Sequence, residues 1–174
     1  KKYAPYAKDS NRMNIFYLHK SPTISAQYMC DKHVVKMILE SAQLLCTAHH
    51  TCPTNAERPE KFYKKTHTNH PCAIWTRNCI GNYKWLCDHA QSLLDEYTYR
   101  YGKTHASTSV ISWCVSNIPD IPDGELTDIA QCMPDEYKSN DPVIAYRNYY
   151  NKAKSHLHNW KRRQIPHWVV SVNS

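Results

Sequence analysis

The sequence contains few glycines and none of the glycine-rich motifs that hold phosphate groups. Only 3 of its 174 residues are glycine, and neither GxGxxG nor GxxxxGK occurs. Dinucleotide-binding Rossmann domains and P-loop nucleotide hydrolases are therefore excluded. The chain also lacks any apolar run of about 18 residues, the length that a membrane-spanning helix requires. We therefore expect no membrane association.

No two of the cysteines form a CxxC pair, which argues against a zinc knuckle or a thioredoxin-type redox motif. The first residues, Lys1–Tyr6, contain no apolar signal-peptide core, so we expect a cytoplasmic protein, in the host cytoplasm if it is phage-encoded. Several cysteines occupy apolar positions of helical patterns, which predicts reduced, buried thiols. The eight are Cys30, Cys46, Cys52, Cys72, Cys79, Cys87, Cys114 and Cys132.

Apolar periodicity predicts an all-α fold: a single compact helical domain over residues 13–174, built on two long helices, a C-terminal helix and a basic tail. Residues 1–12 are polar, and we expect them to be a flexible tail ahead of Met13. The first long helix is predicted from Ser21-Pro22, an N-cap followed by proline, to about His50.

The second long helix is predicted from about Pro71 to about Tyr101, with Gly102 as its C-cap. A shorter helix is predicted at about 106–117, and the proline-rich residues 118–141 are expected to be a connection. Asp141-Pro142 repeats the cap-plus-proline signal and predicts the start of the C-terminal helix.

The first long helix has one apolar and one polar side. At about 100° per residue, the apolar side chains are Ile24, Val34, Val35, Ile38, Ala42 and Leu45. The polar side repeats at the i, i+3, i+4 spacing that stacks side chains in one stripe: His33, Lys36, Glu40, Gln43 and Thr47. An ordinary solvated helix surface would give the same stripe, so that alternative stays open.

The stripe nevertheless combines groups that can carry out chemistry. A partly buried lysine can become a nucleophile, a carboxylate one turn away can act as acid or base or stabilise a cationic sugar, and an imidazole can move protons near neutral pH. Pairing with Lys36 is expected to keep Glu40 ionised at neutral pH. The candidate catalytic residues are Glu40, His33, Lys36 and Asp31.

Charge is distributed unevenly along the chain. Six of the 22 bases follow Asp141, the last of the 15 acids, and they alternate with aromatic residues. Cations neutralise phosphates, and aromatic rings stack on unpaired bases at about 1–3 kcal/mol each. We therefore predict nucleic-acid binding, the alternative being core aromatics beside solubilising bases. The candidate DNA-binding residues are Lys32, Arg100, Lys103, Tyr146, Arg147, Tyr150, Lys154, Trp160, Arg162, Arg163 and Trp168.

His67 and His70 are the strongest local metal signal, because they are three residues apart before a predicted helix start. A His-x-x-His pair outside a helix has no fixed geometry, and no nearby carboxylate completes the usual set of three or four ligands. We therefore predict no metal site and no cofactor. A metal-dependent nuclease or hydrolase that uses His33, His67, His70 and Glu40 remains an alternative.

Four segments occur in an order that resembles one known family: Met13–Phe16, Ala26–Lys36, Asp128–Tyr137 and Pro166–Trp168. They resemble the small helical pyrimidine dimer DNA glycosylase/abasic-site lyases of the phage endonuclease V type. The resemblance covers the first helix and about the last 45 residues, and leaves residues 51–117 unmatched. It implies an all-α fold and excision of a damaged base from duplex DNA.

The resemblance also implies a mechanism. In that family the mature N-terminal amine forms a Schiff base with the sugar, and a glutamate between two phosphate-binding arginines assists. The flanking bases correspond here to Lys32 and Lys36, and the glutamate corresponds to His33, so Asp31 or Glu40 would have to supply the carboxylate. With residues 1–12 in place, a lysine would replace the amine, or the base would be removed by simple hydrolysis.

Residues and resemblance together predict a monomeric DNA glycosylase, with or without abasic-site lyase activity, that acts on damaged or modified duplex DNA. Extrahelical capture of a nucleotide costs a few kcal/mol, less at a lesion, and aromatic stacking can offset it. A non-catalytic nucleic-acid-binding protein is the main alternative from a different class.

Overall fold

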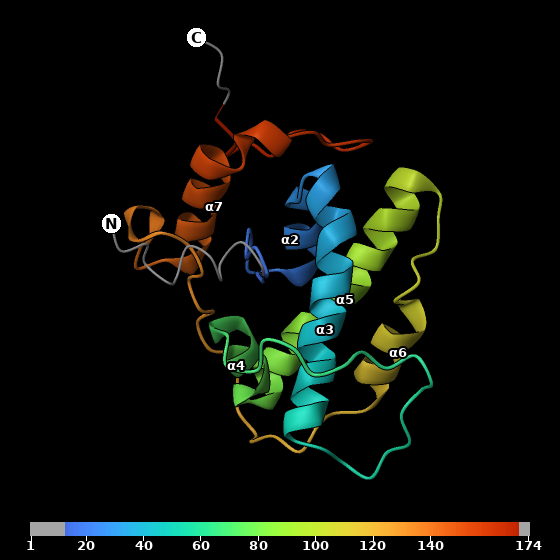
Figure 1. The fold of residues 1–174 in the computed structure, drawn as a ribbon. Coiled ribbons are helices and arrows are strands. Elements are labelled where there is room, and N and C mark those ends of the chain that lie inside the picture. Colours follow the sequence, from blue (N-terminus) through green and yellow to red (C-terminus); the bar gives the residue numbers. More distant parts are fainter. Residues whose placement is uncertain (1–12, 171–174) are drawn as a thin grey trace, which may run out of the picture.

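The structure is a computed structural model that describes residues 13–170; the tail predicted for residues 1–12 lies outside them. Over this range the fold is all-α, as predicted, and contains no strand (Figure 1). Two short 3-10 turns, η1 and η2, accompany the α-helices. The elements are α2 (Pro22–Tyr28), α3 (Asp31–Thr51), α4 (Pro71–Asn78), α5 (Ile80–Tyr101), α6 (Thr108–Ser116), η1 (Asp135–Tyr137), α7 (Pro142–Ala153) and η2 (Ser155–Leu157).

The long helix α5 is the centre of the fold, because it packs against α2, α3, α4 and α6. The helix α7 lies on the other side of α3 (Figure 1). The buried segment 13–18 joins the two sides. Its Phe16 ring stacks on His33 of α3 at 4.3 Å and lies 6.1 Å from Tyr149 of α7.

Both predicted long helices are interrupted. The first is broken at Met29–Cys30, whose backbone is extended, and the second at Cys79. At the first break the Cys30 N–H donates to the Tyr150 hydroxyl at 2.9 Å, and at the second the Ile80 N–H donates to the Pro122 carbonyl at 2.9 Å. Groups distant in sequence replace the helical hydrogen bonds, so the local pattern could not indicate either break.

Gly81 shows how closely the connecting segment approaches α5. A Cβ at this position would lie 2.5 Å from the Leu126 nitrogen, so only glycine fits.

Apart from the two breaks, the predicted helix ends are confirmed. Gly102 has the left-handed φ of 65° expected of a C-cap. Asp141 accepts a hydrogen bond from the Val143 N–H at 2.9 Å at the start of α7.

The core side of α3 largely follows the predicted apolar face. Val34, Ile38, Ala42 and Leu45 are fully buried, whereas Val35 is 37% exposed. The cysteines are free thiols, and all are buried except Cys52, which is partly exposed. The prediction of buried, unpaired thiols is therefore confirmed.

Candidate active site

Glu40 lies near the middle of α3 and is only 6% exposed. The Asn14 N–H donates a hydrogen bond to its carboxylate. Its other polar oxygen, Oε2, has no hydrogen-bond partner among residues 13–170. Burial raises the pKa of Glu40 to about 7, although Lys36, the Asn14 N–H and Lys154 all oppose the shift. At this pKa the carboxyl group is only about half ionised at neutral pH, because burial outweighs the neighbouring charge of Lys36 that was expected to keep Glu40 ionised.

His33 lies two turns before Glu40 on the same side of α3 and is also buried. Its Nδ1 is hydrogen-bonded to the Tyr150 hydroxyl at 2.8 Å, and its ring stacks on Phe16. Burial, together with Lys154 and Lys36, lowers the pKa of His33 to about 3. The imidazole is thus neutral at physiological pH, and the predicted proton transfer near pH 7 does not fit it. His33 instead fixes the wall of the site between α3 and α7.

Two lysines face this buried pair in different environments. Lys36 is exposed on α3. Lys154, the C-cap of α7, is half-buried, with its Nζ 5.1 Å from the centre of the Tyr149 ring. Burial lowers the pKa of Lys154, while the charge of Glu40 acts in the opposite direction. The partly desolvated amine predicted at Lys36 is therefore at Lys154.

Asp31 has a complete set of partners. Its carboxylate forms an ion pair with Arg100 at 3.0 Å and accepts hydrogen bonds from Asn159 Nδ2 at 2.7 Å and from the Lys161 N–H at 2.9 Å. Arg100 is only 2% exposed and also pairs with Glu96 at 2.8 Å. The catalytic role predicted for Asp31 and the DNA contact predicted for Arg100 do not fit this interior network, which anchors the C-terminal segment to α3 and α5.

The predicted DNA-binding aromatics lie mostly inside the protein. Tyr146 and Tyr150 are fully buried, and Trp160 is 8% exposed with its Nε1 donating to the Tyr28 carbonyl at 2.8 Å. These three rings cannot stack on DNA bases, because they belong to the core. Trp168 is partly exposed, and the Arg147 guanidinium lies 5.2 Å from its ring centre.

The C-terminal bases are also engaged with the protein. Arg163 pairs with Glu96, and both Arg162 and Arg163 lie over the Tyr99 ring, at 4.5 and 4.3 Å. Arg162 is nevertheless exposed, as is Lys103 just after α5. These two remain available for a phosphate contact.

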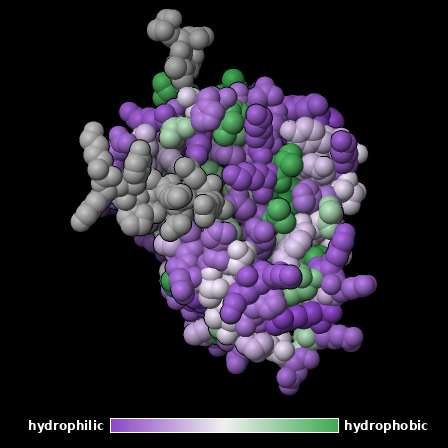
Figure 2. Space-filling view, in the orientation of Figure 1, coloured by the Kyte–Doolittle hydropathy of each residue, from purple (hydrophilic) through white to green (hydrophobic). Residues whose placement is uncertain are grey.

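The exposed side of α3 combines basic and apolar groups. Lys32 and Lys36 are exposed. Val35, between them in the sequence, is 37% exposed, and Leu39, three residues after Lys36, is 41% exposed. We call these four residues the α3 surface stripe. Figure 2 shows a mostly hydrophilic face with a narrow hydrophobic strip over α3 and α5. Helical periodicity predicted a buried Val35, so this combination of exposed basic and apolar groups was not predicted.

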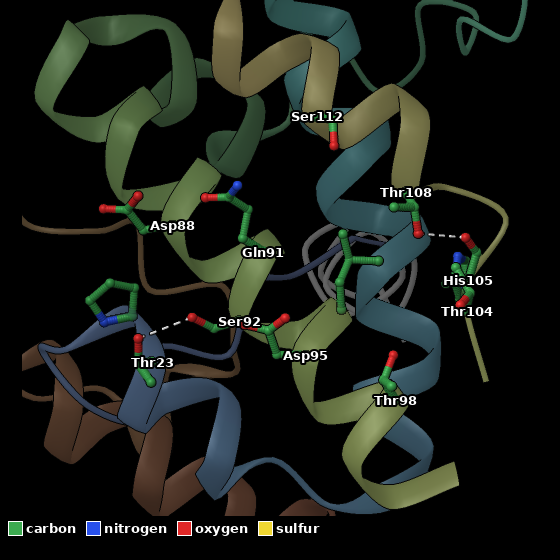
Figure 3. Close-up of a pocket in the computed structure, with 12 residues that line it drawn as sticks. Thr23, Asp88, Gln91, Ser92, Asp95, Thr98, Thr104, His105, Thr108 and Ser112 are labelled. Carbon is green, nitrogen blue, oxygen red and sulfur yellow. Dashed lines mark hydrogen bonds between the residues drawn. The ribbon is translucent and has the colours of Figure 1, made fainter. Parts of the chain in front are cut away.

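A cavity of about 560 Å³ lies on the opposite side of α5 from this site, between α2, α5 and the start of α6. Figure 3 shows hydroxyl and carboxylate side chains around it, with the Thr23 and Ser92 hydroxyls 3.0 Å apart. Asp88 and Asp95 contribute negative charge, which repels phosphate. None of the predicted site residues lines this cavity, so it is separate from the candidate active site.

The histidines predicted as alternative metal ligands do not assemble. Among residues 13–170, the one group of three or more metal-ligating side chains is His70, Cys72 and Cys132. His33 and Glu40 are not part of it, which removes the geometric basis for the alternative hydrolase site. Sequence reasoning missed Cys132 as a neighbour of His70, because the two are far apart in the chain.

Comparison with known protein families identifies the family to which the chain belongs. The family described as pyrimidine dimer DNA glycosylase matches residues 13–109, more than half of the sequence. The chain therefore belongs to this DNA glycosylase family. The match includes most of the middle region that the resemblance left out, and it excludes the two C-terminal segments that suggested it. No curated protein and no solved structure gives a significant match.

The helices of residues 13–170 include no candidate membrane span. None of the helices there combines the length and the hydropathy that crossing a bilayer demands.

Proposed function

We propose that this protein excises a damaged pyrimidine base from duplex DNA, with Glu40 as the acid–base group. The observation that carries the proposal is a buried carboxyl group in the part of the chain that matches the family, with a pKa of about 7 and one oxygen that has no partner among residues 13–170. An acid or base is most effective when its pKa lies near the working pH. Strongly shifted ionisable groups also concentrate at functional sites.

The chemistry assigned to Glu40 has two stages. The protonated carboxyl group donates its proton to the leaving pyrimidine as the bond from the base to C1′ of the sugar breaks. The resulting carboxylate then faces the positive charge that develops on the sugar and stabilises it. A water molecule or an amine adds to C1′ to complete base removal.

The position of Asn14 supports the assignment of Glu40 in preference to His33. The resemblance implies a glutamate beside the amine of the mature N-terminus. In this chain the backbone nitrogen of Asn14 donates to the Glu40 carboxylate, whereas His33 is a neutral imidazole enclosed by Phe16 and Tyr150. The Asn14 side chain holds this backbone in place, because its Oδ1 accepts the Ile15 N–H at 2.7 Å.

DNA contact is assigned to the α3 surface stripe. Lys32 and Lys36 supply cations for phosphates on either side of the damaged nucleotide. Val35 and Leu39 are exposed apolar groups of the kind that other proteins insert between base steps. Lys36 belongs to this stripe and also interacts with Glu40, so DNA bound along the stripe brings a nucleotide to the edge of the buried site.

Lys154 is proposed as the amine for an abasic-site lyase step. A lysine becomes a nucleophile when its pKa falls, because more of it is neutral. Lys154 is half-buried with a lowered pKa, and it interacts with Glu40. Its neutral amine would add to the aldehyde carbon of an abasic sugar, and loss of water would form the imine.

The test is base release from ultraviolet-irradiated and undamaged duplexes, together with borohydride trapping on abasic DNA. We expect base release from the irradiated duplex and a trapped adduct that disappears in Lys154→Gln. The matched control is Lys152→Gln, which removes an exposed charge two residues away on the same helix. An adduct that persists in Lys154→Gln assigns the amine to another residue. DNA binding without base release would favour the non-catalytic alternative.

A further inference from the structure

Three metal-ligating side chains meet at the start of α4. His70 is the N-cap of α4, Cys72 lies in its first turn, and Cys132 comes from the connection before η1. Their ligand atoms all lie within 4.8 Å of one another. All three residues are buried, at 8%, 0% and 1% exposure. We call this group the His–Cys–Cys cluster.

We propose that the His–Cys–Cys cluster binds a zinc ion. Two thiolates and an imidazole are soft and borderline donors that favour zinc over magnesium, calcium or manganese. Zinc binds sulfur at about 2.3 Å and nitrogen at about 2.0–2.1 Å in a tetrahedron, so donor atoms around it lie roughly 3.5–3.8 Å apart. The Cys72 and Cys132 sulfurs are 3.3 Å apart, and a small outward movement brings them to that spacing.

Metal binding exchanges one hydrogen bond for a metal bond. The Nδ1 of His70 accepts the Cys72 N–H at 3.1 Å and so caps α4. Ligation through Nδ1 uses the same lone pair, and ligation through Nε2 requires the proton to move to Nδ1, so either choice ends the cap. The metal replaces it as the link between His70 and Cys72, and the two thiols lose their protons on binding.

The cluster holds together segments that are distant in sequence. Cys132 is already linked to the candidate active site, because its carbonyl accepts a hydrogen bond from Asn14 Nδ2 at 2.9 Å. Its N–H donates to the Tyr146 hydroxyl of α7 at 3.1 Å. A zinc ion would thus clamp α4 to the segment that positions Asn14 beside Glu40. Three protein ligands would leave the fourth position to water.

The test is metal binding by the full-length reduced protein after treatment with a chelator. Cobalt(II) is the spectroscopic probe, because thiolate ligands give it an intense near-ultraviolet charge-transfer band. We expect one equivalent of cobalt with this band, and its displacement by zinc. Outer-shell partners alone are worth about 10–100-fold in metal affinity, so Cys72→Ser or Cys132→Ser should weaken zinc binding by about 100-fold or more.

Two control variants keep the result specific. Cys114→Ser removes another fully buried thiol, one that contacts Cys46 instead of the cluster. His67→Ala removes the exposed histidine next to the cluster. Both variants should keep the full equivalent of cobalt and the charge-transfer band. Loss of the band in these controls as well would overturn the assignment.

A second measurement needs no variant and so does not depend on the serine variants folding. At a urea concentration at which the zinc-free protein is alkylated at these buried thiols, zinc should protect Cys72 and Cys132, as peptide mass mapping would show, while the other cysteines keep their reactivity. Unchanged alkylation of both at saturating zinc, or absence of the charge-transfer band, would overturn the proposal. Neither readout involves DNA, so failure here is distinct from failure of the glycosylase proposal.

Discussion

Helix α3 carries two buried carboxylates whose surroundings are opposite. Asp31, in its first turn, is paired with Arg100 and accepts hydrogen bonds from Asn159 and Lys161. Glu40, near its middle, is equally buried, but its Oε2 has no partner among residues 13–170. The sequence offers both as candidates for catalysis, with Glu40 as the leading one, and their surroundings in the structure differ.

The difference shows how to distinguish a structural acid from a reactive one. A buried polar group without a partner costs free energy, so its presence requires a reason other than stability. Glu40 reduces that cost by holding a proton, which is why its pKa rises to about 7. The same proton makes it a usable acid. Asp31, with every oxygen engaged, has nothing to give to a substrate.

The largest effect is expected from neutralising Glu40. Glu40→Gln keeps the shape of the side chain and removes the transferable proton, so base release from irradiated duplex should slow by about 10²–10⁴-fold. Single-turnover kinetics would measure the change, with circular dichroism and DNA affinity as checks on folding. The exposed Glu60→Gln is the matched control and should retain full activity. A folded Glu40→Gln protein that releases base normally would remove α3 as the reaction centre.

The complementary change is at Asp31. Asp31→Ala leaves the fully buried Arg100 guanidinium with fewer partners, and breaking a buried ion pair in this way costs about 3–5 kcal/mol of folding stability. Because Arg100 keeps Glu96, we expect the lower end of that range. Urea denaturation would measure it, with the exposed Asp95→Ala as control. Base release per folded molecule at low temperature should be unchanged, and a large loss there would make Asp31 a second active-site group.

The protonation of Glu40 predicts a pH-dependent stability. Its pKa is about 7 in the folded protein and 4.5 ordinarily, so the unfolded chain ionises first as the pH rises. The stability difference between wild type and Glu40→Gln is therefore greatest below pH 4.5. It should fall by about 3 kcal/mol as the pH passes 7, at about 1.36 kcal/mol for each pKa unit.

His33 acts with the opposite sign. Its pKa is lowered from 6.5 to about 3, so its contribution to stability is complete above pH 6.5 and is lost as the pH falls toward 3. Both proteins contain His33, so this contribution cancels in the difference. Denaturation of wild type and Glu40→Gln at several pH values would measure the difference in their free energies of unfolding. A difference that does not change with pH would contradict the raised pKa of Glu40.

The sequence predicted the features that depend on local chemistry. These include the all-α class, the left-handed Gly102 that ends α5, and the capped start of α7 at Asp141. It did not predict the breaks at Cys30 and Cys79, because the partners of the freed backbone groups, Tyr150 and Pro122, lie far along the chain.

The same limit applies to the candidate site. The helical spacing placed His33, Lys36 and Glu40 on one side of α3, but it could not show which of them is buried. Segment 13–18 and α7 cover His33 and Glu40 and leave Lys36 in solvent. Alternation of bases and aromatics near the C-terminus did not reveal that Tyr146 and Tyr150 are core residues. The Tyr146 and Tyr150 rings fill the interior, whereas basic side chains such as Arg162 reach the surface.

The smallest expected effect concerns DNA binding by the surface side of α3. Replacing Lys32 and Lys36 with alanine removes two exposed cations, and each lost phosphate contact should reduce the slope of log affinity against log salt by roughly one unit. Affinity titrations over a salt series would measure the change. Lys64→Ala with Lys65→Ala removes the same charge from the exposed loop before α4 and is the control. An equal change in both double variants would indicate that net charge alone is sensed, and that the α3 surface stripe has no special role in DNA binding.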